Sequence, residues 1–247
     1  MRRLVIGCTK VILILLIAVL PFITACGKQT PESAPIPPPV PVPQPAPTPA
    51  PIPAPEVPSA DTAEQHNERG IALGKEGQHE QAISEFGKAI ELDPEYDEAY
   101  FNRGIVYSER GQPERAIKDF GEAIRLNPDY AEAYANRGIV YTELDQLESG
   151  IQDFDEAIRL NPDYAEAYFN RAVAYDGQGQ PEQAIRDCDE AIRLNPDYAK
   201  AYCLRGLVYK AQGEKSEAKA DFEKCIALTD DPRLGEWAEE EMAEFSE

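Results

Sequence analysis

The segment AIRLNPDYAEAY occurs at residues 123–134 and again, without a change, at 157–168. It returns a third time at 191–202 as AIRLNPDYAKAY, so that the period is 34 residues. A fixed period of this length is typical of arrays in which each short unit buries its apolar face only by stacking on its neighbours. The repeat therefore predicts a stack of like units.

Alignment on the Asn-Pro and Asp-Pro steps divides the chain into five units, which are 63–96, 97–130, 131–164, 165–198 and 199–232. Each unit contains two stretches with the apolar spacing of a helix. In the second unit, a first helix is predicted from Glu98 to Arg110 and ends at Gly111, which can adopt the left-handed cap. A second helix is predicted to begin near Pro113 and to stop at Asn127, because a residue before proline is pushed out of the helical region.

The same residue types return at fixed places in the five units. Position 8 is small, and its residues are Gly70, Gly104, Gly138, Ala172 and Gly206. Position 24 is usually aromatic, and its residues are Phe86, Phe120, Phe154, Cys188 and Phe222. In this pattern the units resemble tetratricopeptide repeats, whose paired helices approach closely at small residues while aromatic rings fill the space between them.

The resemblance covers 63–232 and implies an all-α fold, a right-handed superhelical solenoid of five helix-turn-helix units. The tail at 233–247 has apolar residues spaced for one face of a helix, and they are Leu234, Trp237, Ala238, Met242 and Phe245. Such arrays need a cap at an open end, so we expect the tail to be a capping helix.

One position departs from the family pattern. Position 7 is usually leucine there, but here it is arginine in every unit, whereas position 23 is always acidic. The five pairs are Arg69 with Glu85, Arg103 with Asp119, Arg137 with Asp153, Arg171 with Asp187 and Arg205 with Asp221. Because a guanidinium near a helix interface must be hydrogen-bonded or solvated, we predict that these arginines bind position-23 acids within a unit or across adjacent units.

The third unit carries two unfavourable substitutions. Gly150 stands where most units have alanine inside a helix, and Asp145 replaces the capping glycine. A glycine costs a helix about 0.8–1 kcal/mol relative to alanine. The sequence therefore predicts that the third unit is the weakest in the array.

The first residues have the pattern of an export signal, with a basic start at Arg2 and Arg3 and an apolar stretch that ends near Ile23. The sequence ITAC resembles the lipobox of bacterial lipoproteins, which implies cleavage after Ala25 and lipidation of Cys26. An uncleaved signal anchor is the alternative, although the apolar stretch is short for a bilayer span. In both cases the rest of the chain is expected outside the cytoplasm, anchored to the cell membrane or the outer membrane.

Residues 1–25 are thus the expected signal peptide, and 26–60 the expected linker. Fourteen of the 22 prolines fall in this linker, which predicts a semi-rigid polyproline spacer. The formal net charge is −21. Loss of the three basic residues in the signal leaves 21 basic and 45 acidic residues, a net charge of −24. A phosphate backbone would be repelled, so nucleic acid is excluded as a partner and a basic partner is favoured.

The sequence offers little chemistry. Only His66 and His79 are histidines, and HExxH, CxxC, GxSxG and phosphate-loop motifs do not occur. We therefore expect no enzyme, cofactor, metal or small-molecule substrate. The cysteines Cys188, Cys203 and Cys225 could include a disulfide in an exported protein, but their places on the helices favour buried thiols.

The resemblance implies protein–protein interaction through a concave groove lined by positions 2, 5, 6, 9 and 12 of the first helices. The expected groove residues are Glu98, Phe101, Asn102, Ile105, Glu132, Asn136, Ile139, Glu166, Phe169, Asn170 and Val173. Glutamates around apolar residues suit a basic amphipathic segment and not a C-terminal carboxylate. A membrane-tethered scaffold is therefore the favoured function. The alternatives are a structural subunit of an envelope assembly machine and an adaptor for a cell-wall hydrolase.

Overall fold

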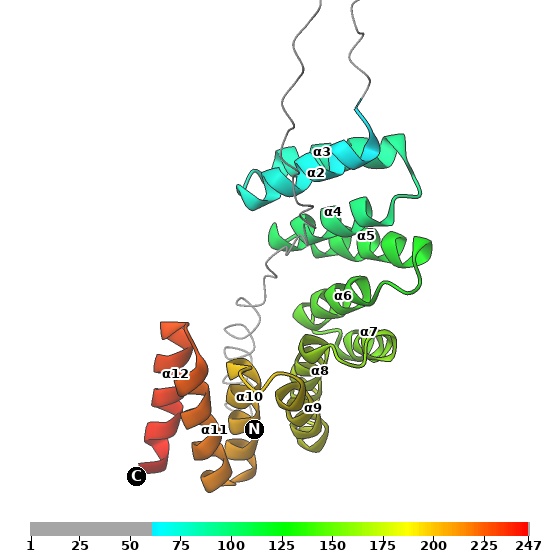
Figure 1. Cartoon of the computed structure of the whole chain (residues 1–247). Coiled ribbons are helices and arrows are strands. Elements are labelled where there is room, and N and C mark those ends of the chain that lie inside the picture. Colours follow the sequence, from blue (N-terminus) through cyan, green and yellow to red (C-terminus); the bar gives the residue numbers. More distant parts are fainter. Residues whose placement is uncertain (1–60, 247) are drawn as a thin grey trace, which may run out of the picture. The chain divides into compact units, whose positions relative to one another are not determined.

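The computed structural model describes residues 61–246, which contain eleven α-helices and no strand (Figure 1). The helices are α2 (Ala63–Lys75), α3 (His79–Leu92), α4 (Asp97–Glu109), α5 (Pro113–Leu126), α6 (Ala131–Glu143), α7 (Leu147–Leu160), α8 (Ala165–Gly177), α9 (Pro181–Leu194), α10 (Ala199–Gln212), α11 (Lys215–Leu228) and α12 (Pro232–Ala243). A 3-10 turn, Glu244–Ser246, follows. The predicted signal, the predicted lipidation site Cys26 and the predicted linker lie outside the described residues.

The helices pack as successive hairpins in chain order. Each first helix pairs with the second helix that follows it, as α2 does with α3 and α10 does with α11, and each hairpin then packs on the next. Successive first helices also contact one another, from α2 with α4 to α8 with α10. This is the all-α solenoid that the 34-residue period predicts.

The helix boundaries follow local sequence signals. In the second unit, α4 and α5 begin and end within a residue of the predicted bounds. Gly111 between them has φ +63°, the left-handed conformation that lets a helix end and the chain turn back. The first helix of the array begins with a capping box, in which Thr62 accepts from the Gln65 N–H and the Gln65 side chain accepts from the Thr62 N–H.

Close approach of the two helices in a hairpin depends on the glycine at position 8. A Cβ atom on Gly104 would lie 2.8 Å from the ring of Phe120, and one on Gly70 would lie 2.5 Å from Phe86. The fourth unit solves the same problem differently, because the smaller Cys188 replaces phenylalanine and leaves room for Ala172. The residue at position 8 and the residue that packs against it from position 24 therefore change together.

The structure shows how the third unit accommodates Gly150 and which backbone conformation Asp145 adopts. Asp145 adopts φ +59°, a conformation that a residue with a side chain takes at a cost. Gly150 faces Thr142, whose hydroxyl donates to the Gly138 carbonyl oxygen at 2.9 Å. A Cβ atom on Gly150 would lie 2.6 Å from that hydroxyl oxygen. The glycine therefore makes room for the threonine.

The C-terminal helix α12 covers the open side of α11. Leu234 and Ala238 are buried there, and Trp237, Met242 and Phe245 pack against the same core. The ring centroids of Phe222 and Trp237 are 5.9 Å apart and nearly perpendicular. The apolar face of the tail therefore closes the last hairpin.

Candidate partner-binding surface

The predicted groove residues lie on α4, α6 and α8, and the structure divides them into accessible and buried sets. Glu98, Glu132 and Glu166 are exposed at the second position of their units. Glu64 on α2 is exposed as well. These four carboxylates occur once per repeat on successive first helices, so the acidic row that the sequence predicts is accessible to solvent.

The two predicted groove phenylalanines differ. Phe101 is partly exposed, and its ring lies 4.7 Å from that of Tyr130 and 5.8 Å from that of Phe120. Phe169 is fully buried and packs against Tyr198 in a tilted arrangement with 5.1 Å between the ring centroids. The assignment of Phe169 to the groove is therefore wrong, because the ring packs between helices and has no surface for a partner.

The aliphatic residues at position 9 show the same trend. Ile139 is partly exposed, Ile105 is 8% exposed and Val173 is 0% exposed. Val173 belongs to the core that joins α8 to α12, so its assignment to the groove is also wrong. Ile105 is mainly a core residue. Ile139 remains as the accessible aliphatic contact of this position.

The asparagines at position 6 are used in three ways. Asn102 donates to the side-chain oxygen of Asn67 at 3.1 Å, and Asn136 donates to the Glu132 carbonyl oxygen of its own helix at 2.8 Å. Asn170 is 2% exposed, and its side-chain oxygen has no hydrogen-bond partner among the described residues. Asn170 cannot meet a partner on the surface, which corrects the third asparagine of the prediction.

Tyrosines beside the acidic row hold part of it in place. The hydroxyl of Tyr96 donates to Glu98 at 3.3 Å and accepts from Asn67 at 3.2 Å. Burial raises the pKa of Tyr130, and the nearby Glu98 and Glu132 carboxylates raise it further. The tyrosine hydroxyls therefore stay protonated beside the glutamates and can donate to them.

The predicted pairs of arginine and acid form within four units. Arg103 donates to the two carboxylate oxygens of Asp119 at 2.6 and 2.9 Å. The same two-bond contact joins Arg137 to Asp153, Arg171 to Asp187 and Arg205 to Asp221. The Arg103 guanidinium also lies 5.7 Å from the ring of Tyr100 and 5.9 Å from that of Tyr107. In these four units the position-7 arginine therefore forms a structural ion pair and is not part of the partner surface.

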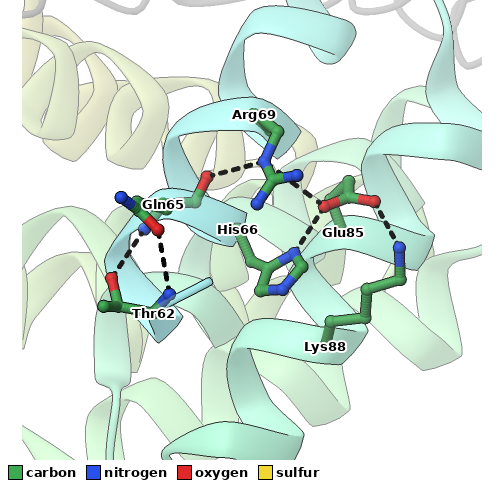
Figure 2. Close-up of polar contacts among 6 residues, drawn as sticks. All are labelled: Thr62, Gln65, His66, Arg69, Glu85 and Lys88. Atoms are coloured by element: carbon green, nitrogen blue, oxygen red, sulfur yellow. Dashed lines mark hydrogen bonds and ion pairs between the residues drawn. The ribbon is translucent and has the colours of Figure 1, made fainter. Parts of the chain in front are cut away.

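The first unit departs from this arrangement (Figure 2). Glu85 lies 2.6 Å from both Lys88 Nζ and His66 Nδ1, whereas Arg69 Nε is 3.8 Å away. These bonds, first that of Lys88 and then that of His66, lower the pKa of Glu85. Arg69 instead donates to the Gln65 carbonyl oxygen at 3.3 Å. The predicted pair is thus present only as a long contact.

Sequence reasoning missed a second set of acids. Arg171 also bonds to Asp155 of the preceding unit at 2.5 Å, and Arg205 bonds to Asp189 in the same way. Both aspartates occupy position 25, which is Gly87 and Gly121 in the first two units. Because arginine and aspartate here are 16 residues apart, as in the pairs within a unit, the spacing was a signal for the contact.

The expectation of three buried thiols is wrong for two of the cysteines. Cys203 on α10 and Cys225 on α11 form a disulfide, with 5.3 Å between their Cα atoms, and Cys188 is free and buried. Positions 5 and 27 of a unit face each other across a hairpin, as Ala135 and Ala157 do in one core cluster. The two cysteines occupy these facing positions, and this spacing could have predicted the bond.

Among residues 61–246, no cluster of three or more His, Cys, Asp and Glu side chains is placed to hold a metal ion. No helix in this range is both long enough and apolar enough to cross a membrane. The predicted groove residues that are accessible are three glutamates, two asparagines, one aromatic ring and one aliphatic side chain. This composition suits recognition of another macromolecule.

Sequence models of the tetratricopeptide repeat match residues 97–130, 165–198, 199–232 and 120–152. A related TPR repeat model matches 70–111 and 140–179, so the matches together span 70–232 of the 247 residues. The chain belongs to the tetratricopeptide repeat family. A search of curated protein sequences found no significant match.

Several solved structures share the fold of this repeat protein. A crystal structure of MamA is 28% identical with a TM-score of 0.60, over 71% of this chain and 96% of MamA. YrrB, described as a TPR protein with an unusual peptide-binding site, is 23% identical with a TM-score of 0.59, over 72% and 92% of the two chains. PilF of Pseudomonas aeruginosa is 19% identical with a TM-score of 0.64, over 74% and 88%. The family and these structures support a protein-interaction module.

Proposed function

We propose that the chain is a membrane-tethered scaffold outside the cytoplasm, and that it binds a basic amphipathic segment of a protein partner along its first helices. The observation that carries this proposal is the row of exposed glutamates at one position per repeat, with Phe101 and Ile139 accessible beside it. YrrB, a protein with the same fold, is described by its peptide-binding site.

The accessible residues concentrate the binding surface on two units. Glu98, Phe101 and Asn102 lie on α4, and Glu132 and Ile139 lie on α6. Asn136 on α6 and Glu166 on α8 flank this set. The apolar side chains would supply affinity, whereas the glutamates would speed the encounter with a positively charged segment.

Two features support the location outside the cytoplasm. The first is the export signal and lipobox-like sequence before Cys26, which predict translocation and lipidation. The second is the disulfide between Cys203 and Cys225, since disulfides persist mainly in oxidising compartments outside the cytoplasm. Metabolic labelling with a fatty acid, compared between wild type and Cys26→Ser, tests the anchor.

The binding surface is tested by affinity capture from detergent-solubilised membranes, followed by mass spectrometry. The test variant is Glu98→Lys with Glu132→Lys. The matched control is Glu91→Lys with Glu240→Lys, which makes the same change in net charge at exposed positions on α3 and α12. We expect the test variant to lose a protein that wild type and control both enrich.

Other outcomes point to the alternatives or against the surface. Recovery of membrane neighbours in a fixed ratio would indicate a structural subunit of an assembly machine, and recovery of a cell-wall hydrolase would indicate an adaptor. Equal capture by the test variant and the control would show that the partner does not use the glutamate row. Phe101→Ala should also weaken capture, because the ring is accessible.

A further inference from the structure

The last position of each of the first four units is tyrosine, and these residues are Tyr96, Tyr130, Tyr164 and Tyr198. Their rings are packing elements at the side of the first helices. Tyr130 lies against Phe101, and Tyr198 lies against Phe169. Burial raises the pKa of Tyr164 and of Tyr198, as expected for rings held among neighbouring side chains. The repeat therefore builds a site for one aromatic ring per unit.

The neighbours of these rings are themselves periodic. Charged and phenolic groups near Tyr130 include Tyr96, Asp97 and Glu98, which are the last residue of the preceding unit and the first two residues of its own. Tyr198 has Tyr164 and Glu166 at the same places. The residues at the equivalent places for the fifth unit are Tyr198, Ala199 and Lys200.

The fifth unit has the surroundings of this ring but not the ring. Pro232 stands where the tyrosine would be, and α12 begins at that residue, whereas α4, α6, α8 and α10 each begin at the residue after such a tyrosine. A pocket of about 320 Å³ is found here. We call it the terminal pocket. The residues that line it include Tyr198, Ala199, Lys200, Leu228, Thr229 and Leu234. Its volume falls at the lower end of the range for ligand-binding clefts.

We propose that the terminal pocket binds an aromatic side chain of the partner, in the place that a tyrosine of the chain itself fills in the first four units. This proposal rests on the proposed function, because the pocket lies at the end of the glutamate row. Lys200 occupies the same repeat position as Glu98, Glu132 and Glu166. A segment bound along that row would therefore reach the pocket at one end.

The polar residues that line the pocket include Lys200, Thr229, Asp230 and Asp231, and the lysine favours tyrosine over phenylalanine. Lys200 is partly buried, and this desolvation lowers its pKa, while Asp231 opposes the shift. In the earlier units a glutamate at position 2 of the same unit lies near the phenol, as Glu98 does to Tyr130 and Glu166 does to Tyr198. An ammonium group can instead donate to the phenol oxygen. The apolar walls from Leu228 and Leu234 would contact the ring.

The first test uses capped amino acids as probes of the full-length chain in detergent, with methyl NMR signals of Leu228 and Leu234 as reporters. N-acetyl-tyrosinamide should shift both signals saturably and bind about tenfold more tightly than N-acetyl-leucinamide, since aromatic contacts add to area burial. N-acetyl-phenylalaninamide should bind between them. Lys200→Met should remove the difference between the tyrosine and phenylalanine probes.

Matched variants locate the site. Leu228→Trp should fill the pocket and abolish the shift at Leu234, whereas Leu228→Met should keep it. Ala199→Phe fills the pocket from α10 and serves if Leu228→Trp does not fold. Tyr130→Ala should open an equivalent site in the second unit, reported by Leu126, which holds the place of Leu228 there. Absence of saturable shifts, or shifts that survive both filling variants, would overturn the proposal.

The role in partner binding is tested by capture with Leu228→Trp and Leu228→Met. A loss of about tenfold in partner affinity for Leu228→Trp alone would support the anchor. Equal capture by the two variants would overturn it, whatever the probes do. If Leu228→Trp weakens capture while Glu98→Lys with Glu132→Lys does not, the partner uses the terminal pocket but not the glutamate row. The two proposals can therefore be contradicted separately.

Discussion

The two halves of the array differ in how their units are joined. At the interfaces before α8 and α10, Arg171 and Arg205 each bond to an aspartate of their own unit and to one of the preceding unit. At the two earlier interfaces the second acid is replaced by Gly87 and Gly121, which have no side chain to offer. The first interface is instead joined by a different ion pair, Arg110 with Glu80 at 2.6 Å, so the bond from position 7 to the preceding unit is a feature of the C-terminal half.

Packing follows the same division. A continuous core joins α8 to α12, whereas the earlier helices contain several smaller clusters, two of which include a residue of α8. Phe101 and Phe169 occupy the same position of their units, yet only Phe169 is fully buried. The N-terminal half thus leaves Phe101 and Ile139 accessible, whereas the C-terminal half has the larger continuous core.

The largest predicted effect separates the two phenylalanines. Phe169→Ala should lower the free energy of unfolding by about 3–5 kcal/mol, because a fully buried ring leaves a cavity. Phe101→Ala should cost about 1–2 kcal/mol, since part of the ring is already in water. Trp237 is the only tryptophan and packs on the same core as Phe169, so its fluorescence in urea reports the C-terminal half. Equal shifts of the urea midpoint in the two variants would show that the two rings do not differ in their contribution to stability.

Reduction of the disulfide should weaken the same half. Cys203 and Cys225 are 22 residues apart, and a closed loop of this size contributes about 3 kcal/mol by restricting the unfolded chain. We expect the Trp237 midpoint to fall on reduction while hydrogen exchange in α4 and α5 stays the same. Cys188→Ala serves as the control for thiol exchange. An unchanged midpoint would show that the bond is not formed or does not stabilise.

A third prediction concerns the weak unit between the halves. Hydrogen exchange at 147–158 should be faster than in the second unit, because Gly150 lowers helix stability. Gly150→Ala alone should not correct this, since its Cβ atom would lie 2.6 Å from the Thr142 hydroxyl oxygen. Gly150→Ala with Thr142→Ala removes this overlap but leaves the Cβ atom 3.0 Å from the Gly138 carbonyl oxygen, so local stability should rise by less than the about 1 kcal/mol of an unhindered helix position. Protection equal to that of the second unit in the wild type would refute the weakness.

The smallest predicted effect comes from adding to the second unit an aspartate at the position that Asp155 occupies in the third unit. A Cβ atom on Gly121 would lie 3.7 Å from Arg137 Nη1, so Gly121→Asp should give Arg137 the second acid that Arg171 has. Relative to the isosteric Gly121→Asn, the gain should be about 0.5 kcal/mol, because the site is near solvent. The gain should shrink in high salt. Asp155→Asn should lose a similar amount, and no difference between Asp and Asn would exclude the ion pair.

The helices and the ion pairs within units could be predicted because each signal recurs every 34 residues. The burial of Phe169 could not be predicted from its own unit, because it depends on the helix that follows. There α10 supplies Cys203 and Leu204 to the same core, where α6 supplies Ala135 and Asn136 next to the unit of Phe101. Larger apolar neighbours thus cover one ring and leave the other accessible.

The groove prediction shared this limit. It treated equivalent positions as equally accessible, although Val173 and Asn170 lie in the better packed half. The disulfide was missed for a related reason, because each cysteine was assessed on its own helix and not across the hairpin. In a repeat protein, periodicity predicts the backbone, whereas accessibility depends on which neighbours differ from the consensus.

The association rate of the captured partner tests the central claim most directly. Wild type, Glu98→Lys with Glu132→Lys, and the control Glu91→Lys with Glu240→Lys are compared at low and high salt. If the glutamate row attracts a basic segment, the test variant should associate about tenfold more slowly at low salt, with little difference at high salt and little effect of the control. Equal slowing by the control, or a loss that does not depend on salt, would contradict the account.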